Sequence, residues 1–431
     1  MIVLAGPALT AVEAAERLAT FGGVSWVKSP GVEGERSFVA CAPVQVVSAA
    51  QPEALQIAWL EHRKRWAPAP PRCPLAVGFF TYEYGKALVG GAYAAQVPSG
   101  WSAMEFRFYD AMFEISDTTR VLAVDEAAAQ RLLQRLRHEP AEPDDSLLGS
   151  LSAAEPDDLF LEGVARVQEY LRAGDTYQVN LARRLVAPLA NQGALTGLSL
   201  SAQLEQHTPA PFGIWYGPAA EGVARALVGN SPECFIRITV DGVIETSPIK
   251  GTRPRVHEHS LDDNRVVQEL ATSQKDRAEH DMIVDLERND LGRICTTGSV
   301  RVVEHARVMH LPTVHHLVST VRGQLVQPRP SLREILAATF PGGSITGAPK
   351  RRAMEIIAEL ESHERGPYTG ATGWLGAAGD IEMAIAIRTA ALSNDRLVLW
   401  VGGGIVVDSD AEAELAETNA KAQAFTRLWA V

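Results

Sequence analysis

The chain has 431 residues, of which 46% are hydrophobic and 21% charged, a composition typical of a folded protein with a substantial core. Its net charge of −12 argues against a nucleic-acid or anionic-membrane surface, and no segment is apolar enough to predict a membrane span. The N-terminal segment does not resemble a signal peptide and the four cysteines are widely scattered, so we expect a cytoplasmic protein without disulfides.

Helical and β-rich stretches alternate along the first third of the chain. We expect helices at residues 9–20, 53–65 and 126–137, and β-rich runs at 75–80 and 106–115. Residues 139–157 are rich in proline, aspartate and serine and predict an exposed connector between a first part, 1–138, and a second part, 158–431. We expect the two parts to form one large globular unit.

The second part carries nearly all the unusual motifs. Amphipathic patterns predict helices at 158–173, 262–288, 348–363 and 410–428. Strands are expected at 211–217, 234–246, 381–390 and 396–401, with a turn at Asp241-Gly242 inside the second of these.

A single lysine, Lys250, lies between Pro248 and Gly251 on what we expect to be stiff, sharply turned backbone. A lysine has an unperturbed pKa of about 10.4, so it acts as a nucleophile near neutral pH only where its surroundings remove the proton. Taken alone, the motif favours a solvated turn lysine, and only the rest of the chain can change that interpretation.

Two pairs of acidic residues have helical spacing. Asp276 and Glu279 share one helix face, as do Glu414 and Glu417, with Lys421 one turn further along. Carboxylates presented by two helices could hold Mg²⁺, which would offset the acidic charge around an anionic substrate. The alternative for either pair alone is an ordinary solvated helix face.

Two glycine-rich segments could bind anions through backbone N–H groups. Residues 341–350 lead into a helix but lack the Lys-Ser/Thr of a Walker A loop, and Gly402–Gly404 are expected to follow a strand. Tight turns are the alternative. Arg388, on an otherwise apolar predicted strand, is a candidate clamp for an anionic group.

Together these segments resemble the chorismate-utilising enzyme family. The family's motifs occur here in its order, as DTYQVNLARR, SPECFIR, SPIKGTRPR, DRAEHDMIVDLERNDLGRI, HLVSTVRG, PGGSITGAPKRRAMEII, YTGATGW, IEMAIAIRT and GGGIVVDSDAEAELAET. They cover nearly all of residues 158–431, whereas the first part resembles the family mainly through GFFTYEYG. The resemblance implies an α+β fold of two facing, mostly antiparallel sheets surrounded by helices, with the site between them.

The resemblance also implies roles for individual residues. Glu279 and Glu417 match magnesium ligands, with Asp276 and Glu414 at the nearby acidic positions. Tyr368 and Arg388 match residues that hold the enolpyruvyl carboxylate of chorismate, and the Gly402, Gly403 and Gly404 backbone matches a carboxylate-binding segment. Further matching pocket positions are Thr346, His316 and Lys421.

Two positions distinguish the reactions of the family. Members that add water to chorismate carry a lysine base where this chain has Gln178, which cannot deprotonate water. Members that make anthranilate carry alanine at the position of Lys250, whereas members that aminate chorismate to 4-amino-4-deoxychorismate carry lysine. The resemblance therefore implies that the Lys250 amine attacks carbon 2 of the ring, with Glu233 as general acid/base, before ammonia attacks carbon 4 and expels the lysine.

The implied substrates are chorismate and ammonia. The chain has no Gly-x-Cys-x-Gly elbow, so we expect a separate glutamine amidotransferase subunit to supply the ammonia. A tryptophan-binding segment of many relatives is replaced here by Val27-Lys28-Ser29, which argues against tryptophan binding. The open alternatives are anthranilate synthesis and a non-catalytic chorismate-binding subunit.

Overall fold

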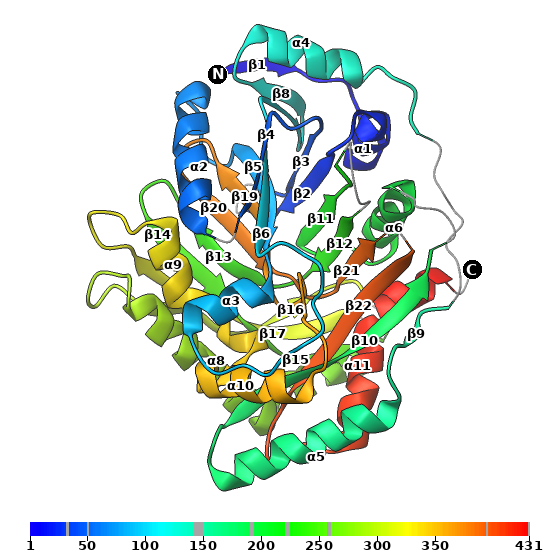
Figure 1. Ribbon diagram of the computed structural model, residues 1–431, viewed down its shortest axis with the longest axis vertical. Helices are drawn as coiled ribbons and strands as arrows, with labels where there is room; N and C mark the ends of the chain where they lie inside the picture. Colours follow the sequence, from blue (N-terminus) through cyan, green and yellow to red (C-terminus); the bar gives the residue numbers. More distant parts are fainter. Residues whose placement is uncertain are drawn as a thin grey trace.

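The computed structural model describes residues 1–31, 34–49, 51–141, 150–189, 194–219, 225–256, 260–393 and 395–429. Two antiparallel sheets, of 12 and 10 strands, form its centre, and helices surround them (Figure 1). This is the α+β architecture of two facing sheets that the sequence predicted. None of the helices in the described ranges is both long and apolar enough to cross a membrane.

Both sheets take strands from before and after residues 139–157, so the two parts of the chain are built into the same layers. The larger sheet has the order β1 (Ile2–Ala5), β8 (Thr119–Ala123), β7 (Ala111–Ile115), β3 (Arg36–Ala40), β2 (Ser25–Ser29), β11 (Phe212–Tyr216), β12 (Ala226–Ser231), β21 (Thr389–Ser393), β22 (Arg396–Ile405), β10 (Gln178–Pro188) and β18 (Gly347–Ala348), with β9 (Ser152–Ala153) paired to β10. The smaller sheet has the order β15 (Ile249–Pro254), β17 (Val314–Gln324), β14 (Val243–Ser247), β13 (Cys234–Ile238), β20 (Ile381–Ile385), β19 (Ala371–Gly376), β5 (Pro74–Phe80), β6 (Met104–Phe108) and β4 (Gln45–Ala49), with β16 (Arg301–His310) paired to β17.

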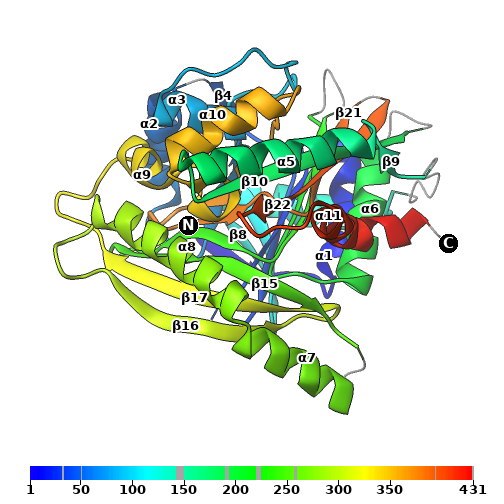
Figure 2. The same ribbon diagram turned by 90° about the horizontal axis from the view of Figure 1, so that it is seen from below.

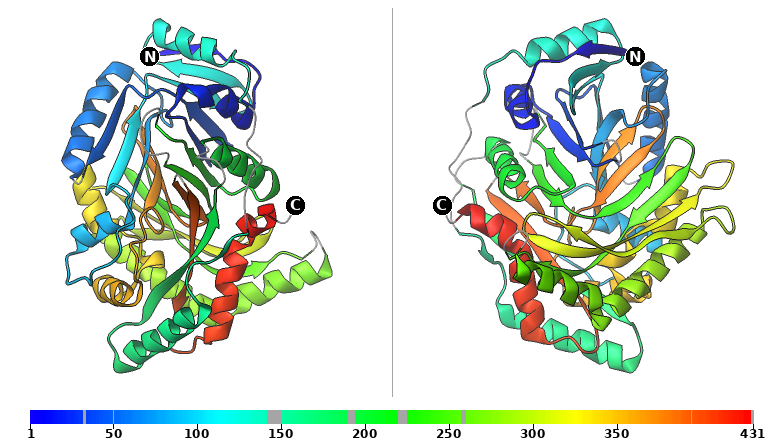
Figure 3. Two further views of the ribbon diagram at one scale, coloured as in Figure 1. Left: turned by 45° about the vertical axis from the view of Figure 1, so that its right-hand side comes forward. Right: turned by 180° about the vertical axis from the view of Figure 1, so that it is seen from behind.

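Helices cover the outer faces of the sheets. They are α1 (Ala11–Leu18), α2 (Pro52–Trp66), α3 (Tyr82–Val89), α4 (Glu126–Arg135), α5 (Asp157–Ala173), α6 (Ala194–His207), α7 (Leu261–Thr272), α8 (Gln274–Gly292), α9 (Leu332–Thr339), α10 (Lys350–Leu360) and α11 (Ala411–Thr426). Helix α8 packs on β15 and β17, α10 and α5 on β10, and α11 on β22. The two views of Figure 3 show α4 at one end of the molecule and α5 at the other.

Apolar side chains fill the space between the sheets and the space under the helices. The largest cluster joins strands of both sheets, for example Phe38 and Leu227 from the larger sheet and Phe79 and Ile236 from the smaller. A second cluster lies under α1, α4, α6 and α11, and a third between β10, α5 and α10. This packing fixes both sheets, and so the strands that carry the candidate site.

Several predicted elements are wrong in detail. The β-rich run predicted at 106–115 is confirmed as β structure, but it divides into two strands, β6 and β7, that belong to different sheets. The predicted helix 262–288 is two helices, because Ser273 is extended and its hydroxyl caps α8 by accepting the Asp276 N–H at 3.2 Å. Of the predicted connector, residues 142–149 lie outside the described residues, while β9 and the start of α5 fall inside its remaining part.

Three corrections bear on the site. The predicted strand 381–390 is interrupted, and Arg388 stands between β20 and β21 with φ 49°. Gly402–Gly404 lie inside β22 and pair with β10 instead of following the strand. Lys250 is itself a strand residue of β15, paired with Leu317, and the irregular backbone is a bulge at Gly251 with φ 74°.

Candidate active site

A cavity of about 300 Å³ is lined by β10 and β22 of the larger sheet and by β15 and β17 of the smaller one. Figure 2 shows these strands close to α8 and α11, which add the acidic side chains. The charged lining residues are Glu233, Asp276, Glu279, Glu414, Glu417, Lys250, Arg253, Lys275, Arg388 and Lys421. Acidic and basic side chains are therefore equal in number around the cavity, although the whole chain carries −12.

Lys250 faces this cavity from the bulged part of β15. The left-handed backbone of Gly251 makes the bulge possible, since residues with a Cβ rarely adopt φ near 74°. Burial lowers the pKa of the Lys250 ammonium, and the Glu279 carboxylate opposes that shift. The cavity thus holds an amine that loses its proton more readily than a solvated lysine.

Glu233 lies between β12 and β13, and its carboxyl is buried, with 4% of the residue exposed. The Ser344 hydroxyl donates a hydrogen bond to Glu233 Oε1 at 2.6 Å. Burial raises the pKa of Glu233 to about 7, although Ser344 and the Lys250 charge act in the opposite direction. A carboxyl group with such a pKa can both donate and accept a proton near neutral pH.

Arg388 and His316 form a polar pair in the cavity wall. An Arg388 Nη2 hydrogen donates to His316 Nε2 at 3.0 Å, so the other ring nitrogen, Nδ1, carries the proton and donates to Thr252 Oγ1 at 2.9 Å. Burial and the adjacent guanidinium lower the pKa of His316 to about 3, which keeps the ring neutral. Burial also lowers the pKa of Arg388 to about 10.

No carboxylate among the described residues lies within ion-pair distance of Arg388, although it lines the same cavity as five acidic side chains. A buried guanidinium without a carboxylate partner is costly unless a ligand supplies one. Arg388 is therefore a candidate to bind an anionic group.

Gln178 reaches the cavity end of β10 behind Gly404. A Cβ on Gly404 would lie 2.9 Å from Gln178 Nε2 and 2.9 Å from Lys250 Nζ, so only glycine lets both groups approach β22. Gln178 is fully buried, and neither its amide oxygen nor its amide nitrogen has a hydrogen-bond partner among the described residues. Buried amides are normally paired, so this unpaired amide is unusual. Gln178 itself does not line the cavity; it lies behind Gly404, which does.

The acidic side chains come from two helices that face one cavity. Burial raises the pKa of both Glu279 and Glu414, whereas the Lys421 ammonium, 2.6 Å from the carboxylate, lowers that of Glu417. Asp276 instead accepts a hydrogen bond from Arg253 Nη2 at 2.8 Å.

These carboxylates are the oxygen donors that Mg²⁺ prefers. The raised pKa values of Glu279 and Glu414 show negative charge that the surrounding protein compensates poorly, which a bound cation would relieve. Among the described residues no three acidic or histidine side chains are already gathered at metal-binding distances. The donor chemistry fits a hard cation shared between α8 and α11.

The remaining predicted residues are distributed around this centre. Tyr368 lines the cavity and stacks on Trp400 with ring centroids 5.9 Å apart, and Lys421 Nζ donates to the Gly402 carbonyl at 2.8 Å. Gly402 and Gly404 line the cavity, whereas Gly403 does not; a Cβ there would lie 3.0 Å from the Glu414 carboxylate. Thr346 does not reach the cavity, because it is fully buried and its hydroxyl donates to the Gly342 carbonyl.

Sequence reasoning missed several cavity residues. Ser344, the partner of Glu233, lies in a glycine-rich loop where a lone hydroxyl was a usable signal. Asn180, Thr252 and Trp400 also line the cavity, and each is a polar or aromatic residue on a strand with no spacing pattern to mark it.

A family model for chorismate binding enzymes matches residues 23–427 of the chain. The chain belongs to the chorismate-binding enzyme family. It is therefore a chorismate-utilising enzyme.

Similar curated proteins of this family include both anthranilate synthases and aminodeoxychorismate synthases. Anthranilate synthase component 1 of Streptomyces coelicolor is 38% identical over 388 residues, covering 83% of this chain and 74% of the relative. Aminodeoxychorismate synthase component 1 of Escherichia coli is 39% identical over 346 residues, covering 80% and 74%.

Solved structures share the fold. Anthranilate synthase component I of Streptococcus pneumoniae superposes with a TM-score of 0.76 at 28% identity, covering 92% of this chain and 93% of that one. The menaquinone-specific isochorismate synthase MenF of Escherichia coli reaches a TM-score of 0.76 at 17% identity, with 99% and 93% covered.

Proposed function

We propose that this enzyme converts chorismate and ammonia to 4-amino-4-deoxychorismate through a covalent intermediate on Lys250. The observation that carries the proposal is the Lys250 amine, which lines the cavity with a lowered pKa together with Glu233, whose pKa is raised to about 7. A nucleophile and a proton donor in one partly dry cavity are the two groups that substitution at a ring carbon requires.

The reaction follows from these two groups. The neutral amine of Lys250 bonds to carbon 2 of the ring, the ring double bond shifts, and the carbon 4 hydroxyl leaves as water with a proton from Glu233. Ammonia then bonds to carbon 4, the double bond returns, and the carbon–nitrogen bond to Lys250 breaks. Glu233 recovers a proton from the attacking nitrogen, and the enolpyruvyl ether stays intact.

Chorismate carries two carboxylates, and the lining offers cations for both. Arg388, with Tyr368 beside it, would bind the enolpyruvyl carboxylate. Mg²⁺ held by Glu279, Glu414 and Glu417 would bind the ring carboxylate and neutralise its charge. The inward-facing backbone of Gly402 and Gly404 supplies further donors at that end of the cavity.

Gln178 supports ammonia over water as the second nucleophile. Its amide cannot act as a base toward water, which needs one, whereas ammonia is nucleophilic without deprotonation. The amide nitrogen lies against the same glycine as Lys250, and the amide oxygen lacks a partner among the described residues. It can accept a hydrogen bond from ammonia close to the covalent intermediate.

The ammonia would come from a glutamine amidotransferase subunit. The names of the relatives from S. coelicolor and E. coli describe each as component 1 of a synthase. Production of ammonia by a second component fits a chain whose sequence shows no glutaminase elbow.

Anthranilate synthesis is the second candidate. The S. coelicolor anthranilate synthase component 1 is 38% identical and covers slightly more of this chain than the E. coli aminodeoxychorismate synthase component 1. That reaction would release pyruvate and would leave the buried lysine without a covalent role.

Product analysis tests the proposal. Purified protein would be incubated with chorismate, Mg²⁺ and ammonium at mildly alkaline pH, followed by mass spectrometry and a pyruvate assay. An aminated product that keeps the enolpyruvyl group, without pyruvate, is expected. Fluorescent anthranilate with equimolar pyruvate would assign the enzyme to the second candidate, and chorismate binding without any product, with a glutaminase also present, would indicate a binding subunit.

A further inference from the structure

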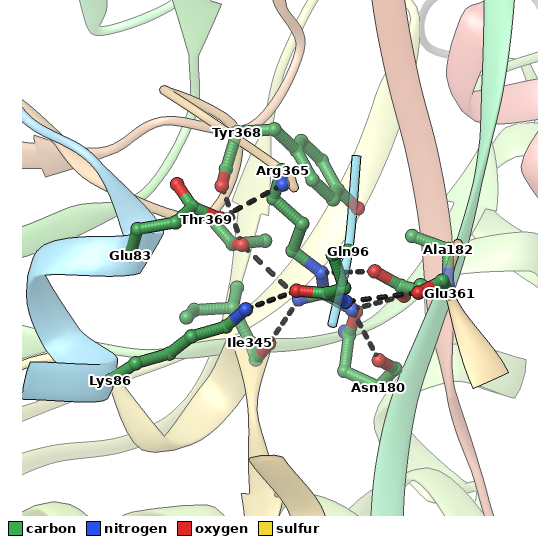
Figure 4. Close-up of polar contacts among 10 residues, drawn as sticks. All are labelled: Glu83, Lys86, Gln96, Asn180, Ala182, Ile345, Glu361, Arg365, Tyr368 and Thr369. Atoms are coloured by element: carbon green, nitrogen blue, oxygen red, sulfur yellow. Dashed lines mark hydrogen bonds and ion pairs between the residues drawn. The ribbon is translucent and has the colours of Figure 1, made fainter. Parts of the chain in front are cut away.

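Arg365 is buried immediately behind the candidate active site. Only 2% of the residue is exposed, and it does not line the cavity. Its five N–H donors all have acceptors: two go to the Glu361 carboxylate at 2.6 and 2.8 Å, one to Asn180 O at 2.7 Å, one to Thr369 Oγ1 at 3.2 Å and one to Ile345 O at 3.3 Å (Figure 4). A guanidinium whose five N–H groups all donate hydrogen bonds restrains the segments that carry the acceptors.

Those segments are walls of the cavity. Asn180 is in β10, Ile345 follows the Ser344 that holds Glu233, and both line the cavity. Glu361 ties β10 a second time, because its carboxylate accepts the Ala182 N–H at 3.0 Å. Arg365 therefore joins β10 to the glycine-rich loop, two parts that are more than 150 residues apart in the sequence.

Arg365 also lies next to the Tyr368 ring. The guanidinium carbon is 5.6 Å from the centre of that ring, within cation–π range, and the ring stacks on Trp400 at an interplanar angle of 8°. Trp400 is backed by a second cavity of about 80 Å³, which Glu361 also lines. Packing behind the stack is thus incomplete, and Arg365 adds polar contacts to a wall that is also held by the Asn180 N–H to Thr346 O hydrogen bond at 2.9 Å.

We propose that Arg365 is a positioning residue for substrate binding, which sets Tyr368 and the Asn180–Ile345 wall without touching the substrate. This rests on the proposed function in one respect, the use of chorismate as the ligand. Lysine at this position would keep the charge beside Glu361 but lose the planar fork and most carbonyl contacts. The wall would relax, and chorismate would bind less well at the Tyr368 end of the cavity.

The test compares Arg365→Lys with Arg107→Lys. Arg107 is a matched buried arginine, 2% exposed, with its guanidinium 3.7 Å from the Tyr216 ring centre, and it does not line the cavity. For each variant, KM for chorismate, kcat and the midpoint of thermal unfolding would be measured. Arg365→Lys should raise KM about tenfold with kcat changed by less than about threefold, since wall position affects binding before chemistry. Arg107→Lys should lose similar stability with KM unchanged.

A KM in Arg365→Lys within twofold of the wild-type value, or an equal rise in Arg107→Lys, would overturn the positioning role. If Arg365→Lys does not fold, Thr369→Val removes one acceptor of the same guanidinium, and a folded Thr369→Val enzyme with wild-type KM overturns the role as well. Wild-type protein that neither binds nor converts chorismate would instead refute the proposed function, so the two failures are distinguishable.

Discussion

Lys250 is a nucleophile only without its proton, and its neighbours act on that proton in opposite directions. Burial lowers its pKa while Glu279 raises it, and the net direction is downward. Glu233 shifts the other way, to about 7, because burial disfavours its charged form. Such opposite shifts bring an ammonium and a carboxylic acid toward the same pH range, where one can lose and the other give a proton.

Replacing Lys250 by alanine should abolish covalent labelling by chorismate. With Mg²⁺ present and ammonia withheld, wild-type protein should gain the mass of chorismate less one water, because the carbon 4 hydroxyl leaves as the bond to Nζ forms. Intact-protein mass spectrometry measures this mass. Lys275→Ala is the matched control, since Lys275 lines the same cavity. A full-size adduct on Lys250→Ala would place the nucleophile elsewhere.

The relative placement of helices α8 and α11 determines whether their carboxylates can bind the same cation. The helical spacing of Asp276 with Glu279 and of Glu414 with Glu417 correctly predicted shared faces, and the structure turns both faces toward one cavity. The two carboxylates of α8 have different surroundings, because Asp276 accepts a hydrogen bond from Arg253 while Glu279 does not. Glu279 and Glu414 are therefore better placed for a cation than Asp276 is.

Glu279→Gln should raise the Mg²⁺ concentration needed for half-maximal activity by about tenfold or more, because loss of a charged oxygen ligand weakens metal binding at least as much as loss of an outer contact. Activity titrated against Mg²⁺ measures the change. Glu412→Gln, an exposed site on α11, provides the control and should leave the titration unaltered. An unaltered titration in Glu279→Gln would exclude Glu279 from the ligand set.

The sequence predicted long elements well and their interruptions poorly. The helices predicted at 53–65, 158–173 and 410–428 match α2, α5 and α11 within a few residues. The break at Ser273 has only a short local signature, a capping serine three residues before Asp276. The left-handed Arg388 has none, because a change of sheet depends on contacts made elsewhere in the chain.

The same limit applies to the site. Charged groups at helical spacing were recognisable, whereas Arg365 with Glu361 four residues earlier reads as an ordinary exposed pair on a helix. Its burial depends on β10 and on the loop at Ile345, which are distant in sequence. A residue that acts through many backbone carbonyls leaves no motif.

On the scale of the whole molecule, two buried carboxylates close to the candidate active site, those of Glu287 and Asp290, affect the stability of the fold. Glu287 and Asp290 of α8 lie beside one lysine, Lys350, whose ammonium is 2.7 Å from Asp290 Oδ2. Glu287 is 3% exposed and accepts the Gly343 N–H at 3.0 Å, next to the serine that binds Glu233. Burial raises the pKa of Glu287 to about 8, since one ammonium does not neutralise two carboxylates.

Because the pKa of Glu287 is raised in the folded protein, the free energy of unfolding should fall as the pH rises. An unfolded glutamate has a pKa of about 4.3, so above that pH the unfolded chain has lost a proton that the folded chain retains up to about pH 8. The stabilisation that the protonated Glu287 carboxyl gives to the folded protein is fully present below about pH 4.3. It is lost as the pH rises toward the folded pKa of about 8, by on the order of 1 kcal/mol per pH unit between these two values.

Glu287→Gln should remove this dependence, because the amide carries no titrating proton and keeps an oxygen for the Gly343 N–H. Denaturant unfolding at pH values from 5 to about 8 measures the slope. The variant should gain stability relative to wild type as the pH rises, whereas Asp285→Asn, an exposed carboxylate on the same helix, should follow the wild-type slope. Parallel curves for wild type and Glu287→Gln would mean that Glu287 is ionised in the folded protein, and that Lys350 is shared between both carboxylates.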